Sequence, residues 1–200
     1  MESRLGILTF EQPLYKVQHA KGLELLSLME EELTGRHPER TTTPAGRPEY
    51  ADCPIDFNIS HAKNLVICTM AEGRTGCDIE QATRKVNLAV ADKFFHPEEK
   101  TFLSDTENIQ ESRKRFIMLW VLKEAYIKFH GTSIGAVRET PLFSVIGSKI
   151  LSQSNESLFY SLYEGGGYML ATAFERKEDR DKLIIRKYSE APDFTLTAAN

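Results

Sequence analysis

Apolar and polar residues follow one another along this chain in two patterns. Short apolar runs are typical of strands, and apolar residues three or four positions apart are typical of helices. Strands are predicted where short apolar runs are bounded by Gly, Asn or charged residues, at 5–10, 56–59, 65–70, 75–80, 142–146, 158–163, 168–174 and 183–188. Helices are predicted at 19–33, 86–95 and 109–129, with another that begins at Pro97. This mixture of elements predicts an α+β fold.

The order of the elements also predicts how the chain divides. The segment 39–54 is rich in Thr, Pro, Gly and charge and is predicted to be loop. Two lobes of similar size would meet near Gly73, so we expect an N-terminal lobe at 1–73 and a C-terminal lobe at 74–200. The three glycines at 165–167 are predicted to form a hairpin turn and not a phosphate loop, because no helix follows them.

Composition narrows the class of protein. Hydrophobic residues make up 41% of the chain and charged residues 27%, which is typical of a soluble globular protein. A formal charge of −4 disfavours an unaided nucleic-acid binder, and no run approaches the roughly 20 apolar residues of a membrane span. The three cysteines form no C-x-x-C pair, and the first ten residues lack the apolar core of a signal peptide. We therefore expect reduced thiols in a cytoplasmic protein.

The first segment with candidate chemistry is G-C-D-I-E at 76–80. Alternation along a strand places Asp78 and Glu80 on the same face. Two carboxylates on one face repel each other unless a cation lies between them, and Mg²⁺, which prefers oxygen ligands, is the natural candidate. Taken alone, so short a pattern is more often a solvated strand end with two acids.

The second segment runs from Trp120 to Lys128 in the longest predicted helix. Glu124 and Lys128 lie one turn apart on the same face, where an ordinary surface ion pair would explain them. The functional interpretation makes Glu124 a third metal ligand and Lys128 a cation that neutralises phosphate. Trp120 is expected in the core or in a pocket wall under either interpretation.

Two further segments carry polar groups suited to anions. F-N-I-S-H at 57–61 ends a predicted strand with Ser60 and His61, which can hold an anion through hydrogen bonds, although a lone histidine more often has a local structural role. Neighbours on an extended chain point in opposite directions and no G-x-S-x-G surrounds the serine, so a hydrolase triad is disfavoured. Arg47, in the loop motif G-R-P, is suited to phosphate or ring contacts.

The order and spacing of these segments resemble the 4′-phosphopantetheinyl transferase superfamily, most closely its monomeric branch, which activates peptide and polyketide synthases. The motifs that carry the resemblance are G-R-P at 46–48, F-N-I-S-H at 57–61, G-C-D-I-E at 76–80, F-F at 94–95 and W-x-x-K-E-A-x-x-K-x-x-G at 120–131. The match covers roughly residues 44–146, and the combination of motifs is specific. The resemblance implies a pseudo-dimer of two α+β lobes with the active site in the cleft between them.

The resemblance also assigns roles to individual residues. Magnesium ligands would be Asp78, Glu80 and Glu124. Contacts with coenzyme A would come from Lys123 and Lys128 at its phosphates, Ser60 and His61 at its 3′-phosphate region, and Arg47 at its nucleotide end. Many relatives carry basic residues on the first helix, where this chain is acidic at 30–32, and Lys21 is the best remaining candidate there. Glu124 and Lys128 would act in catalysis, with Glu124 or a metal-bound water that it orients as the base.

The implied reaction is attack by a serine hydroxyl of an apo acyl or peptidyl carrier protein on the β-phosphorus of coenzyme A, with 3′,5′-ADP leaving. The enzyme is expected to act as a monomer. Basic residues at 84–85 and 113–115 are candidates for docking the acidic carrier, although a solvated face explains them equally well. Two alternatives stay open, a metal-dependent phosphohydrolase built on the same three acids and a non-catalytic relative that binds carriers.

Overall fold

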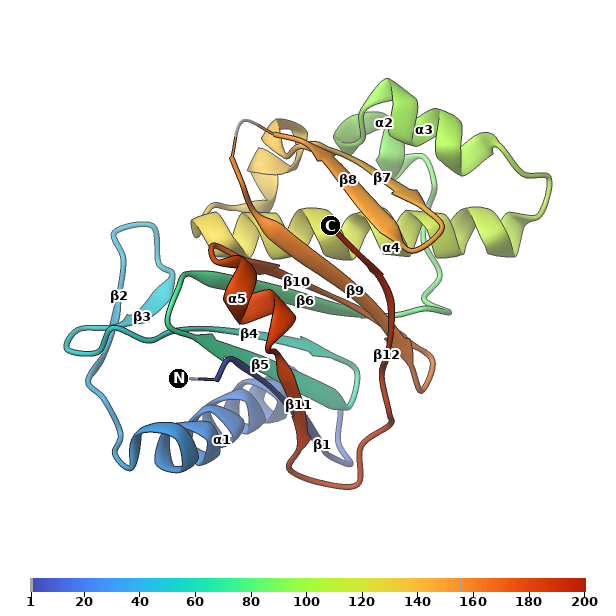
Figure 1. The fold of residues 1–200 in the computed structure, drawn as a ribbon. Coiled ribbons are helices and arrows are strands. Elements are labelled where there is room, and N and C mark those ends of the chain that lie inside the picture. The colour runs from blue at the N-terminus through green and yellow to red at the C-terminus, as the bar shows by residue number, and fades with distance from the viewer. Residues whose placement is uncertain (1, 155) are drawn as a thin grey trace.

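Two β-sheets form the centre of the protein (Figure 1). The computed structural model describes residues 2–154 and 156–200. The first sheet has the order β11-β1-β5-β4, and its strands are β1 (Arg4–Thr9), β4 (Asp56–Ala62), β5 (Leu65–Ala71) and β11 (Ile184–Lys187). Strand β1 is antiparallel to β5 and parallel to β11, so a strand from late in the chain completes a sheet that begins at its start.

The second sheet has the order β6-β10-β9-β12-β8-β7. Its strands are β6 (Thr75–Gln81), β7 (Leu142–Ile146), β8 (Lys149–Gln153), β9 (Phe159–Gly165), β10 (Tyr168–Phe174) and β12 (Thr195–Ala199). The hairpin turn predicted at 165–167 is confirmed, because Gly165 pairs with Tyr168 across β9 and β10. Gly166 and Gly167 adopt φ angles of 57° and 80°, a left-handed conformation that favours glycine.

One long helix covers each sheet (Figure 1). Helix α1 (Tyr15–Thr34) packs on the first sheet, and α4 (Ile109–His130) packs on β6 and β10 of the second. The shorter elements are α2 (Val90–Phe94), α3 (Pro97–Ser104), the 3₁₀ helix η1 (Ile134–Glu139) and α5 (Lys177–Asp181). No helix among residues 2–154 and 156–200 combines the length and the apolar character that crossing a membrane requires.

A shared hydrophobic core joins the two sheets. Leu5 and Ile67 of the first sheet belong to the same buried cluster as Ile79 and Leu170 of the second. Burial of these side chains on both sides fixes the two sheets against each other. The predicted α+β class is confirmed. The division into lobes near Gly73 stays a prediction, since β5 and β6 on either side of it belong to different sheets but β11 returns to the first.

The structure corrects the prediction for 39–54 and shortens one predicted helix. The segment 39–54 contains a small hairpin made by β2 (Arg40–Thr42) and β3 (Pro48–Tyr50). Its polar sequence conceals the hairpin, because contacts with distant segments hold it, among them the buried Tyr50 ring on Phe57, with ring centroids 4.6 Å apart. The helix predicted at 86–95 is limited to the five residues of α2.

A buried carboxylate joins this hairpin to α1. The Glu30 side chain is fully buried and accepts hydrogen bonds from Arg40 Nε and from the Tyr50 hydroxyl, each at 2.8 Å. Burial alone would raise the pKa of Glu30, but the hydrogen bonds from Arg40, His37 and Tyr50 outweigh it and hold the pKa below its ordinary value. The ionised form of Glu30 therefore stabilises the folded chain.

We expect acid to destabilise the protein partly through Glu30. Because its pKa is lower in the folded chain, its contribution is fully present above its ordinary pKa of 4.5 and is lost as the pH falls through the lower folded value. Glu30→Gln should lower the free energy of unfolding at pH 7 by about 1.5–3 kcal/mol and make it less sensitive to pH below 4.5. Urea titrations at pH 7 and pH 3 measure both effects. Glu31→Gln, on the exposed side of α1, is the control, and an equal pH dependence in both variants would contradict the assignment.

Candidate active site

Strands β4 and β6 lie side by side at the border of the two sheets, and side chains hold them together there. The Asp56 carboxylate accepts a hydrogen bond from the Thr75 amide at 2.8 Å, and Asn58 Oδ1 accepts one from the Cys77 amide at 3.0 Å. Alternate residues of β4 thus satisfy the backbone of β6 in place of a strand ladder. The Asp56 and Asn58 side chains thus bridge the two strands.

A cavity of about 430 Å³ opens along this border. It is lined by Ile59, Ser60, His61, Asp78, Ile79, Glu80, Arg84, Trp120, Glu124 and Lys128. The structure therefore brings together the three carboxylates, the lysine of the long helix and the Ser-His pair that the sequence singled out. Strand alternation explains why Asp78 and Glu80 face the cavity together.

Helix α4 supplies the other wall of this cavity. The helix begins after Asn108, whose side chain accepts hydrogen bonds from the Gln110 and Glu111 amides, and it ends at Gly131 with φ of 69°. Glu124 and Lys128 are one turn apart, so both face β6. The remaining faces of α4 are buried in a large hydrophobic cluster, which fixes the angle at which these two side chains enter the cavity.

A glycine allows α4 to approach β6 closely. A Cβ atom on Gly76 would lie 2.2 Å from the carbonyl oxygen of Ala125 and 2.6 Å from the amide nitrogen of Phe129. Because both neighbours are backbone atoms of α4, neither can move aside without shifting the helix. Gly76 is thus what lets the strand with the two acids lie directly against the helix with Glu124 and Lys128.

The carboxylates of the cavity affect one another. Burial, together with the negative charge of Asp78, raises the pKa of Glu124 to about 7 and also raises the pKa of Glu80. Lys128 Nζ lies 2.7 Å from Asp78 Oδ1, and although burial opposes it, this attraction raises the pKa of Lys128. Glu80 forms an ion pair with Arg84. The cavity therefore holds a carboxyl group whose pKa lies close to neutral pH, next to two cations.

The donor set fits Mg²⁺ in chemistry, because three carboxylates line one cavity. As the side chains stand in the described part of the chain, no three His, Cys, Asp or Glu residues form a group that could hold a metal ion. Lys128 and Arg84 pair with Asp78 and Glu80. Each of these ion pairs engages one oxygen of its carboxylate, Oδ1 of Asp78 and Oε1 of Glu80.

A second cavity, of about 530 Å³, adjoins the first and shares Ile59 and His61 with it. It lies between α1 and the β2–β3 hairpin, and His19 of α1 lines it. Burial, together with the charge of Lys128, lowers the pKa of His61. His19 was not among the residues predicted from the sequence, although helical spacing places it on the same face of α1 as Gly22, Leu23 and Leu26, which also line this cavity.

Two of the predicted coenzyme contacts lie away from these cavities. Lys21 forms a surface ion pair with Glu24 at 2.7 Å and lines neither cavity. The Arg47 side chain is 4% exposed and forms a bidentate ion pair with Asp56. Its Nη1 donates to Asp56 Oδ1 at 2.8 Å and its Nη2 to Asp56 Oδ2 at 2.6 Å. Its Nε also donates to the carbonyl of Lys128 at 3.1 Å. Arg47 therefore ties the loop before β3 to β4 and to the end of α4.

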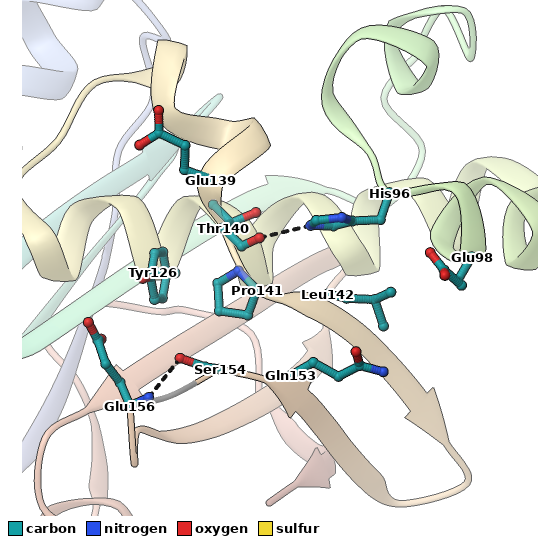
Figure 2. Close-up of a pocket in the computed structure, with 10 residues that line it drawn as sticks. All are labelled: His96, Glu98, Tyr126, Glu139, Thr140, Pro141, Leu142, Gln153, Ser154 and Glu156. Carbon is teal, nitrogen blue, oxygen red and sulfur yellow. Dashed lines mark hydrogen bonds between the residues drawn. The ribbon is translucent and has the colours of Figure 1, made fainter.

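Lys123 is buried on the far side of α4 from the cleft. Its side chain is fully buried, and its Nζ lies 2.9 Å from both Glu99 Oε2 and Thr140 Oγ1. Burial lowers the pKa of Lys123, and Glu99 opposes that shift. Figure 2 shows Thr140 in the wall of a third cavity, of about 470 Å³, where the His96 ring contacts the Thr140 carbonyl oxygen at 2.9 Å. This placement favours a structural role for Lys123.

The candidate docking segments differ in how much of their charge is engaged. Arg84 pairs with Glu80 at the edge of the cleft, while Lys85 is exposed. In the second segment, Lys114 pairs with Glu164 at 2.8 Å, and Arg115 pairs with a glutamate of its own helix. The segment at 84–85 therefore lies closer to the cleft, and a docking role for either segment stays a prediction.

Comparison with known proteins identifies the family. The model of the 4′-phosphopantetheinyl transferase superfamily (ACPS) matches residues 74–181. The 4′-phosphopantetheinyl transferase Sfp of Bacillus subtilis (strain 168) is 30% identical over 160 residues, which cover 75% of this chain and 69% of Sfp. The transferase gsp of Aneurinibacillus migulanus is 39% identical over 43% of this chain, and HetI of Nostoc sp. is 33% identical over 45% of it. The matched segments span 35% of gsp and 38% of HetI. This chain belongs to the 4′-phosphopantetheinyl transferase superfamily.

Proposed function

We propose that this protein transfers the 4′-phosphopantetheine arm of coenzyme A to a serine of an apo acyl or peptidyl carrier protein and releases 3′,5′-ADP. One observation carries the proposal. A single cleft contains Asp78, Glu80 and Glu124 together with Lys128 and the Ser-His pair. Relatives named as 4′-phosphopantetheinyl transferases, Sfp among them, support the same reaction.

Different residues of the cleft would bind the metal, contact the phosphates and accept the proton of the carrier serine. Asp78, Glu80 and Glu124 would hold Mg²⁺, which when bound neutralises charge on the diphosphate. Lys128 would contact the phosphate oxygens on which charge grows as the bond to 3′,5′-ADP breaks. The carrier serine oxygen forms the new bond to phosphorus. Its proton would pass to Glu124, or to a water that Glu124 orients, since Glu124 lines the same cavity.

The second cavity suits the nucleotide end of coenzyme A. It joins the carboxylate cavity at His61, so one extended ligand can occupy both. His61 and His19 would together donate hydrogen bonds to the 3′-phosphate, the part of the coenzyme richest in charge at that end. On this proposal His19 takes the role for which the family resemblance made Lys21 the candidate.

We expect His61→Ala and His19→Ala each to weaken coenzyme A binding by about tenfold or more, which is the effect of losing a hydrogen bond to a charged group. Binding of 3′-dephospho-coenzyme A should change little, since it lacks the phosphate. Isothermal titration with both ligands measures the difference. Lys21→Met is the matched control on α1, because that side chain pairs with Glu24 and lines neither cavity. Equal weakening for both ligands would make the histidines structural.

The proposed reaction is tested by incubating the protein with coenzyme A, Mg²⁺ and a panel of apo acyl and peptidyl carrier proteins. Mass spectrometry should show carriers gaining the phosphopantetheine arm on serine while 3′,5′-ADP accumulates. Release of phosphate without a carrier would favour the phosphohydrolase alternative. Binding of a carrier without modification would favour the non-catalytic one. Action as a monomer in the cytoplasm is proposed on the same basis as the substrates.

A further inference from the structure

Lys128 contacts the carboxylate proposed to hold the metal. Its Nζ lies 2.7 Å from Asp78 Oδ1 and 2.7 Å from Ser60 Oγ, and Ser60 Oγ donates to the same Asp78 oxygen at 2.8 Å. Lys128 Nζ, Ser60 Oγ and Asp78 Oδ1 thus form a closed triangle of hydrogen bonds. The Asp78 side chain is only 8% exposed, so its charge depends on a nearby cation more than on bulk water.

The other two carboxylates of the cleft differ in whether a protein cation pairs with them. Glu80 is paired with Arg84. Glu124 lines the same cavity and has no hydrogen bond or ion pair among the contacts of the described residues. A divalent cation that uses Asp78 Oδ1 must therefore compete with an ammonium already at hydrogen-bond distance from that atom. Two cations on one oxygen repel each other strongly in a partly buried site.

We infer that Lys128 is a built-in counter-ion of the metal site, which keeps divalent metal weakly bound until a coenzyme diphosphate draws its ammonium away. This inference rests on the proposed function. The flexible stem of a lysine lets the ammonium move between two acceptors, and the Lys128 side chain, 29% exposed, already lines the cavity. Metal and coenzyme should then favour each other's binding, and by linkage the effect is the same in both directions.

A lysine that only binds phosphate predicts a different result. Its removal would leave the affinity of the free enzyme for metal unchanged, because no phosphate is present. The counter-ion role predicts that removal of the charge makes metal bind more tightly to the free enzyme. Direct contact between metal and diphosphate would also couple the two ligands, so the decisive measurement is the one made without coenzyme.

The experiment is a Mn²⁺ titration of the full chain, followed by electron paramagnetic resonance, with and without saturating coenzyme A. Without coenzyme, Lys128→Met should bind Mn²⁺ about tenfold more tightly than the unsubstituted protein, a difference of about 1.4 kcal/mol. Lys128→Arg keeps the charge and should stay near the unsubstituted value. Saturating coenzyme A should tighten Mn²⁺ binding to the unsubstituted protein and narrow its difference from Lys128→Met.

Thermal melting gives a second measure of the same competition. Without metal, Lys128→Met should melt lower, because Asp78 is left without a cation, and added Mn²⁺ should raise its melting temperature more than that of the unsubstituted protein. Unchanged or weaker Mn²⁺ binding by Lys128→Met in the free state would overturn the counter-ion role and leave the proposed function standing. If the unsubstituted protein with coenzyme A binds Mn²⁺ no better than Asp78→Asn does, the metal site itself fails, and the proposed function with it.

Discussion

Asp78→Ala is expected to lower kcat/KM for arm transfer by at least about 10²-fold, the scale of losing one electrostatic stabiliser of a transition state. Asp78 lines the cleft and is hydrogen bonded to both Ser60 and Lys128. Its removal takes away a proposed metal ligand and the partner that positions the Lys128 ammonium. Both losses act where charge would grow on the diphosphate, so the two effects reinforce each other.

The measurement is steady-state transfer from coenzyme A to an apo carrier, with thermal melts to show that the variant is folded. Glu98→Ala is the matched control, since it removes an exposed carboxylate from the third cavity (Figure 2) and should keep its activity. Excess chelator should abolish transfer by the unsubstituted protein. Full activity of Asp78→Ala, or full activity in chelator, would refute the assignment of Asp78 to the metal site.

Periodicity predicted most of the regular elements because their apolar residues are strongly patterned. Strand β5 is buried at every position, and α4 shows a long helical repeat that ends at a glycine. The elements that escaped prediction lack such patterns. Strand β2 is exposed along its whole length, and β12 has one buried residue, so neighbouring strands define them more than their own sequence does.

The residues of the candidate site likewise fall into those that local sequence rules predict and those that depend on the tertiary fold. Local rules place Asp78 with Glu80 on one face of a strand, and Glu124 with Lys128 on one face of a helix, and the structure brings all four to one cavity. Local rules do not predict which motif residues are buried. Arg47 and Lys123 carry charges suited to phosphate, yet each meets a carboxylate distant in sequence, Asp56 for Arg47 and Glu99 for Lys123. Only the tertiary fold decides whether such a cation faces a ligand or an internal partner.

Some motif residues hold the strand and the helix of the site in place and do not take part in its chemistry. Gly76 lets β6 touch α4, and Arg47 binds the end of α4 to β4. These residues determine the distance between the strand and the helix that carry the acids. Their substitution should therefore affect both stability and activity, whereas substitution of His61 or His19 should affect ligand binding alone.

Lys123→Met is expected to destabilise the folded protein by about 3–5 kcal/mol, the cost of removing one partner of a buried ion pair. Glu99 would keep its charge without a cation, in a site where both side chains are fully buried. Glu99 also accepts hydrogen bonds from the His96 and Phe143 amides, each at 2.9 Å, so it cannot turn away to reach water. The variant should still bind coenzyme A with near-normal affinity, because the Lys123 ammonium lies outside the cleft.

A double-mutant cycle separates this structural role from contact with the coenzyme. If the pair acts as a unit, Lys123→Met combined with Glu99→Gln should be more stable than Lys123→Met alone, since the uncompensated charge is gone. Urea denaturation gives the coupling free energy, and calorimetry at a temperature where every variant is folded gives the affinity for coenzyme A. A loss of affinity in Lys123→Met that Glu99→Gln does not restore, with little change in stability, would place the Lys123 ammonium on the phosphates as the motif first suggested. The fully buried pair with Glu99 leads us to expect the opposite pattern, a large loss of stability with affinity retained.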